Sequence, residues 1–201
     1  MKFKPCNYDY TKFRSGDIFF SHGCDFIGNC IRLGETGKFR WTDSDLSIVN
    51  HAGFLLSIYG QIFCAEVAGK GIILNSVDIY RKAGNQIIEV YRPKVFDSKD
   101  MMDYFERYIA LWVRRKQDSG YDFGGAVTAS TWFKKLFPFI KNEKGREFCS
   151  EDVYTTMRDR FNPNFPSEWV NNPPNPLQLE LWLKHRTTDY TPVKDYKLCI
   201  A

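Results

Sequence analysis

The sequence of 201 residues lacks any apolar run long enough to cross a membrane as a helix. Its opening segment, residues 1–10, also lacks the apolar core of a secretory signal peptide. We therefore expect a soluble protein that stays in the cytoplasm. If its substrate lies outside the cell, we expect delivery by a phage or a lysis system.

Charge of one sign is also scarce. The 28 Lys and Arg residues are nearly balanced by 24 Asp and Glu residues, which leaves a net charge of +4, and no long basic block is present. This pattern gives little support to nucleic-acid binding. The glycine-rich segment 120–125 lacks both a Walker lysine and a Gly-x-Gly-x-x-Gly pattern. We therefore predict no nucleotide site and no cofactor.

None of the six cysteines forms a Cys-x-x-Cys pair. In a chain of this length without a leader, free thiols are favoured over a disulfide framework. A metal site built from His22, Cys24 and Cys30, with His51 or Cys64, would lack the closely spaced ligand pair typical of structural zinc. We therefore predict no bound metal.

What the chain does contain is a globular composition rich in aromatic rings, which can fill a core or line a cleft. Apolar alternation between turn residues predicts strands near 17–21, 47–57, 61–67, 71–77 and 86–91, with an edge strand in 193–200. Amphipathic spacing predicts helices near 98–116, 127–137, 149–160 and 176–185. We predict one α+β domain over residues 1–201, with its core at about 14–185.

Cys149 is the candidate nucleophile because it stands at the predicted start of a helix. Acidic Glu151 and Asp152 follow in the first turn, and basic Arg158 and Arg160 lie in the last, which is the charge order that a helix dipole favours. Backbone N–H groups at a helix start favour the thiolate, the form that attacks a carbonyl carbon. The same groups can stabilise the oxyanion that forms next.

His51 is the candidate base, and Glu66 is its candidate partner. In an antiparallel hairpin the numbers of opposed residues add to a constant. A two-residue turn at 58–59 pairs His51 directly with Glu66, and one at 59–60 makes them diagonal neighbours on one face. A three-residue turn without a bulge would instead separate them to opposite faces. Cys149, His51 and Glu66 can thus form a nucleophile, a base and an orienting carboxylate.

Plainer interpretations stay open for each of these residues. Cys149 can be a small buried hydrophobic residue, as free cysteines often are, and Cys64 is predicted to be one. Glu66 can be a solvated charge on an exposed face. His185 ends a predicted helix, where a cation is favourable in any case.

At these positions the chain resembles a family, the circularly permuted papain-like cysteine hydrolases of the NlpC type, and YiiX-like proteins in particular. The resemblance rests on four segments in the same order: Gly16-Asp17-Ile18, His51-Ala52-Gly53, Cys64-Ala65-Glu66 and Phe148-Cys149-Ser150-Glu151. It implies a small antiparallel, barrel-like sheet packed against helices. It also implies that Cys149, His51 and Glu66 are catalytic.

Three further residues are candidates for substrate binding. Tyr121 and Asp122 resemble a signature that precedes the cysteine in this family. Trp41 lies in the polar segment 34–45, which is a candidate rim or lid of a cleft.

The resulting hypothesis is a thiol hydrolase that cleaves an amide bond. By resemblance its substrate is a peptide or isopeptide, including a cell-wall-type peptide. An acyltransferase or a lipid ester hydrolase of the same permuted group, acting on an acylated small molecule, is one alternative. A non-catalytic binding module that keeps the fold is the other.

Overall fold

The computed structural model describes residues 6–23, 49–68, 71–81, 85–116, 148–162 and 164–198. Six antiparallel strands form its main sheet, in the order β5-β4-β3-β2-β6-β7. Their bounds are β2 Ile18–Gly23, β3 His51–Ile58, β4 Gln61–Ala68, β5 Gly71–Ser76, β6 Asn85–Pro93 and β7 Tyr190–Pro192. A two-stranded ribbon pairs β1 (Asn7–Tyr8) with β8 (Lys197–Leu198). The prediction of an α+β fold is therefore confirmed.

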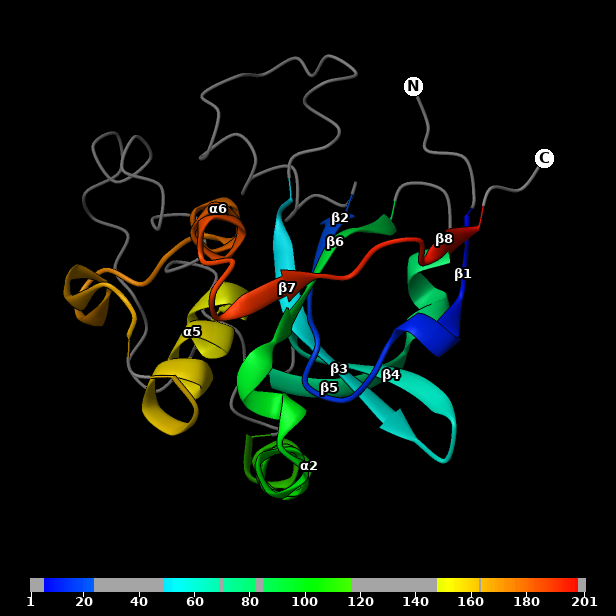
Figure 1. Cartoon of the computed structure of the whole chain (residues 1–201), viewed down its shortest axis with the longest axis horizontal. Helices are drawn as coiled ribbons and strands as arrows, with labels where there is room; N and C mark the ends of the chain where they lie inside the picture. The colour runs from blue at the N-terminus through cyan, green and yellow to red at the C-terminus, as the bar shows by residue number, and fades with distance from the viewer. Residues whose placement is uncertain are drawn as a thin grey trace, which may run out of the picture.

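Within the described residues, three α-helices accompany the sheet: α2 (Lys99–Lys116), α5 (Cys149–Arg160) and α6 (Pro176–His185). Short 3-10 helices lie at η1 Tyr10–Lys12, η3 Val77–Arg81, η4 Lys94–Asp97 and η5 Ser167–Val170. In Figure 1, α5 and α6 lie on one side of the strands and the β1–β8 ribbon lies on the other. No helix in the described part of the chain is both long and apolar enough to span a membrane.

Most predicted elements are present, with two differences of detail. The edge strand predicted in 193–200 is wrong in its position, because the edge strand of the main sheet is β7, which precedes this range and pairs with β6, whereas β8 within the range pairs with β1. The helix predicted near 127–137 lies outside the described residues. The helix at 176–185 is confirmed, and its start carries a reciprocal cap in which Asn175 accepts a hydrogen bond from Gln178 N.

The strands bury side chains on both faces, so the sheet has two hydrophobic cores. Ile18 and Phe20 belong to the core under the helices, whereas Phe19 between them belongs to the core under the ribbon. The same alternation sends Phe54 to the helix side and Leu55 to the ribbon side. Because both faces are buried, a one-residue slip in register would exchange the two cores, which strongly specifies the register.

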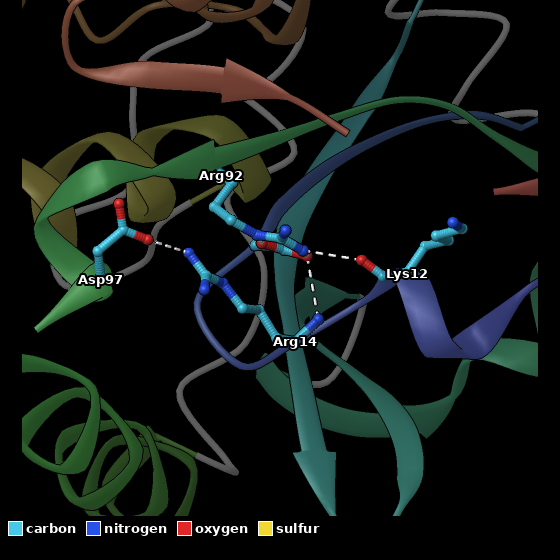
Figure 2. A network of polar contacts seen from close by, with 5 residues as sticks. Lys12, Arg14, Arg92 and Asp97 are labelled. Carbon is cyan, nitrogen blue, oxygen red and sulfur yellow. Dashed lines mark hydrogen bonds and ion pairs between the residues drawn. The ribbon is translucent and has the colours of Figure 1, made fainter. Parts of the chain in front are cut away.

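A buried ion pair fixes the start of β2. Arg92 donates from Nε to Asp17 Oδ1 at 2.7 Å and from Nη2 to Asp17 Oδ2 at 2.8 Å. The same guanidinium reaches the backbone oxygen of Lys12, and Arg14 pairs with Asp97 (Figure 2). This network joins β2, β6, η1 and η4, and we refer to it as the Asp17 network.

Candidate active site

His51 and Glu66 lie on the two strands of the β3–β4 hairpin. Its turn is Tyr59-Gly60, and both residues have positive φ. The numbers of opposed residues add to 119, as in the pair Phe54 and Ala65. This is the register in which His51 and Glu66 are diagonal neighbours on one face. His51 Nε2 donates to Glu66 Oε2 at 2.6 Å. The contact expected from hairpin geometry is therefore present.

Cys149 is the first residue of α5, as predicted, and the preceding Phe148 has extended backbone. The helix packs against β3 and β4. This packing brings the Cys149 side chain into a hydrogen bond with the His51 ring. Because Nε2 of His51 is held by Glu66, Nδ1 is the ring nitrogen that remains to exchange a proton with the sulfur.

The pKa of His51 reflects both neighbours. Burial by itself would lower it, but the charge and hydrogen bond of Cys149, followed by those of Glu66, raise the pKa of His51 well above its ordinary value. An imidazolium between a thiolate and a carboxylate is the charge distribution that these neighbours favour. The side chain of His51 is 22% exposed, whereas Cys149 is 1% exposed, so the sulfur lies deeper than the ring.

Glu66 is buried, and its two oxygens are both occupied. Besides the bond from His51, Oε2 accepts from the Tyr80 hydroxyl, and Oε1 accepts from Asn75 Nδ2 at 2.9 Å. Burial would raise the pKa of Glu66, but His51, Tyr80 and Asn75 together lower it. The solvated Glu66 considered above is therefore wrong, and the side chain is a buried carboxylate among donors.

The site lies where the two cores meet at one end of the sheet. Tyr80 belongs to the core under the ribbon, whereas residues of α5 belong to the core under the helices. His51 is the first residue of β3, so its ring stands at the end of the strand and contacts groups from both sides. The site thus depends on both layers being assembled.

The small residues Ala52 and Gly53, which follow His51, do not leave open space beside its ring. A Cβ at Gly53 would lie 2.7 Å from the Phe19 ring and 2.9 Å from the Ala65 backbone oxygen. The Phe19 ring fills this position, with its centroid 6.1 Å from that of His51. Gly53 is therefore needed for the close approach of Phe19, which in turn packs against the histidine.

The start of α5 is tied to the proline-rich segment that follows the helix. Ser150 is fully buried, and its hydroxyl donates to the Pro174 backbone oxygen at 2.7 Å. Pro174 immediately precedes Asn175, the cap of α6. This contact fixes the first turn of α5, and with it Cys149, to the start of α6.

The other predicted site residues have different outcomes. Tyr121, Asp122 and Trp41 lie outside the described residues, so their role in substrate binding stays a prediction. Cys64 is buried in the core under the ribbon, as predicted, and burial followed by the charge of Glu66 raises its pKa well above the ordinary value. Among the described residues, no group of three or more His, Cys, Asp or Glu side chains could hold a metal ion.

The sequence reasoning missed two residues that contact Glu66. Hairpin geometry could have identified Asn75 from the sequence. In the β4–β5 hairpin Cys64 opposes Asn75, which makes Asn75 a diagonal neighbour of Glu66 on the same face. Tyr80 comes from η3 beyond the end of β5, and no periodicity in the sequence marks it.

Comparisons with known proteins give one distant similarity to describe. No family model matches the chain, and no curated protein matches it. Among solved structures, it is similar to the crystal structure of metalloprotein YiiX from Escherichia coli O157:H7, DUF1105. The identity is 15% over 94% of this chain and 97% of that chain, with a TM-score of 0.49. At this identity and TM-score, the similarity establishes neither the family nor the activity.

Proposed function

We propose that this protein is a thiol hydrolase that cleaves an amide bond, with Cys149 as nucleophile, His51 as base and Glu66 as the orienting carboxylate. The observation that carries the proposal is the position of His51, which is hydrogen-bonded both to Glu66 and to the Cys149 side chain. A base held between a nucleophile and an orienting group is the general arrangement of a catalytic triad.

In the proposed first step the Cys149 thiolate attacks the carbonyl carbon, and the carbonyl electron pair moves to oxygen. Backbone N–H groups of the first turn of α5 lie next to the sulfur and stabilise this oxyanion. The oxyanion then collapses, the bond from carbon to nitrogen breaks, and His51 gives its proton to the leaving amine. The product of this step is a thioester on Cys149.

In the second step His51 takes a proton from water, and the resulting hydroxide attacks the thioester carbon. The bond from carbon to sulfur breaks, which releases a carboxylic acid and returns Cys149 to the thiolate beside a protonated His51. Glu66 is not a proton donor in either step. It accepts from Nε2 and so keeps Nδ1 directed at the sulfur.

The substrate class comes from the resemblance of the four sequence segments to permuted papain-like hydrolases of the NlpC type. We therefore propose this fold relationship and a peptide or isopeptide substrate, including a cell-wall-type peptide. Acyl transfer and cleavage of a lipid ester would both pass through the same thioester on Cys149. In transfer an acceptor group attacks the thioester, whereas in hydrolysis water attacks it.

A screen of a peptide library, which includes cell-wall-type peptides and simple esters, tests the proposal. We expect the intact protein to release product and Cys149→Ser to release none above background. Cys6→Ser is the matched control, because Cys6 is a free, half-buried cysteine in the segment that precedes η1. Equal turnover by Cys149→Ser and the intact protein would remove the proposed nucleophile.

Selective alkylation tests the activated thiol without any substrate. We expect iodoacetamide at neutral pH to label Cys149 faster than Cys6, and to spare Cys64, whose pKa is raised by burial. Peptide mass spectrometry locates the label. If Cys149 reacts no faster than Cys6, the thiolate is not activated. Intact ligand affinity in Cys149→Ala, without turnover of any library member, would favour a binding module.

A further inference from the structure

The environment of Glu66 contains a donor that the proposed mechanism does not use. The Tyr80 hydroxyl donates to Oε2, the oxygen that also accepts from His51 Nε2, while Asn75 Nδ2 donates to Oε1. With both oxygens engaged from different strands and from η3, the carboxylate cannot rotate without breaking at least one of these bonds. Tyr80 and Asn75 therefore form a clamp on Glu66.

We propose that Tyr80 is a positioning residue, whose hydroxyl, together with the Asn75 amide, holds Glu66 as a carboxylate turned toward His51. The proposal rests on the function proposed above, because it assigns Tyr80 a part in presenting the base to Cys149. Tyr80 does not touch the sulfur or the substrate in this proposal. It acts through Glu66 and then through His51.

The position of Tyr80 is itself fixed by packing and by a second tyrosine. Tyr80 is 3% exposed, and its ring packs edge-on against Phe19 with centroids 5.2 Å apart. The Tyr8 hydroxyl donates to the Tyr80 backbone oxygen at 2.8 Å and accepts from Ile87 N at 3.0 Å. Because Phe19 also packs against His51, one aromatic ring supports both groups that donate to Glu66 Oε2.

The charges around Glu66 allow Tyr80 to remain a hydrogen-bond donor. The titratable groups that face the carboxylate are His51 from β3, Cys64 from its own strand and Tyr80 from η3, while Asn75 from β5 is neutral. Burial, followed by the charge of Glu66, raises the pKa of Tyr80 well above its ordinary value. Cys64 is likewise kept protonated. Among these groups, His51 is the one whose protonated form is favoured beside Glu66, because Cys149 and Glu66 raise its pKa.

A titration of Glu66 itself tests the proposal. The protein is labelled with 13C at glutamate carboxyl carbons, the Glu66 signal is assigned with Glu66→Gln, and its pKa is followed by NMR. Tyr80→Phe removes one donor from a buried carboxylate, so we expect the pKa of Glu66 to rise by about one to two units. The acid limb of Cys149 alkylation by iodoacetamide should move upward in pH with it.

The matched control is Tyr91→Phe. Tyr91 is also a buried tyrosine that donates to a buried glutamate, Glu180 Oε1, at 2.9 Å, but this pair joins β6 to α6 away from His51. Its removal should leave the Glu66 titration and the alkylation profile unchanged. If both variants lower the melting temperature but only Tyr80→Phe raises the pKa of Glu66, the change in pKa is not a consequence of lost stability.

A merely structural Tyr80 gives a different result. If Tyr80→Phe lowers the melting temperature but leaves the Glu66 titration unchanged, the proposal is overturned. If Tyr80→Phe fails to fold, Asn75→Ala tests the same clamp at Oε1, and an unchanged pKa of Glu66 there overturns it as well. The titration needs no substrate, so a lack of turnover in the intact protein would contradict the proposed function and leave the clamp measurable.

Discussion

Two buried carboxylates of this protein, Asp17 and Glu66, are held in opposite ways. Asp17 accepts two hydrogen bonds from the Arg92 guanidinium and one from Arg14 N, so its counter-charge is permanent. Glu66 accepts from His51, Tyr80 and Asn75, so its counter-charge is an imidazole that can gain and lose a proton. The first arrangement suits a fixed joint between strands, and the second suits proton transfer.

The pKa values of the two carboxyls move in opposite directions. For Asp17, burial outweighs Arg92 and Arg14 and raises the pKa, whereas for Glu66 the three donors outweigh burial and lower it. Burial alone therefore does not decide the behaviour of a buried acid. The comparison separates a structural carboxylate from a candidate functional one, and the following variants test that separation.

The largest effect is expected at the partner of Glu66. His51→Gln keeps a hydrogen-bond donor near Glu66 but removes the base, so we expect turnover to fall by about 10⁴-fold or more. Unfolding in urea should change little, since an amide can still pair with the carboxylate. Retention of activity within tenfold of the intact protein would show that His51 is not the base.

The partner of Asp17 should show the reverse pattern. Arg92→Met removes the guanidinium and leaves a buried carboxylate without its counter-charge, so we expect a loss of about 3–5 kcal/mol in the free energy of unfolding. The measurement is urea denaturation. Arg92→Lys is the control, because it keeps the positive charge but cannot make the two parallel hydrogen bonds of the guanidinium to Asp17. A loss below about 1 kcal/mol would place Arg92 among ordinary surface cations.

A change at Glu66 itself should have an intermediate effect. Glu66→Gln can still accept from Tyr80 but no longer stabilises the His51 imidazolium by charge, so we expect turnover to fall roughly 10²- to 10⁴-fold. The rate of Cys149 alkylation at neutral pH should fall too, since the imidazolium stabilises the thiolate. An unchanged alkylation rate would mean that Cys149 is activated by the helix start alone.

The smallest effect concerns stability in acid. Because the folded-state pKa of Glu66 lies below its ordinary value of 4.5, Glu66 contributes stability that is present above about that pH and is lost as pH falls further. Asp17 has a raised pKa, so its ionisation costs stability as pH rises through the folded-state value. We therefore expect the free energy of unfolding, measured by urea denaturation at several pH values, to fall less steeply with decreasing pH in Glu66→Gln. In Asp17→Asn it should fall more steeply.

The sequence by itself determined those features that depend on neighbours along the chain. Turn residues and strand alternation restricted the β3–β4 hairpin to a few registers, two of which place His51 beside Glu66, and Tyr59-Gly60 forms one of these turns. Amphipathic spacing and charge order likewise marked the helix that begins at Cys149. These features are local, so short-range propensity is sufficient to specify them.

Tertiary structure alone decided which of these features meet. Arg92 reaches Asp17 across 75 residues of sequence, and Tyr80 reaches Glu66 from a 3-10 helix with no periodic pattern. Phe19 occupies the space beside His51 because the sheet buries both of its faces, which the single pair Ala52-Gly53 does not reveal. Such contacts depend on how two hydrophobic cores close around one sheet, a property of the whole packed chain that no window of sequence contains.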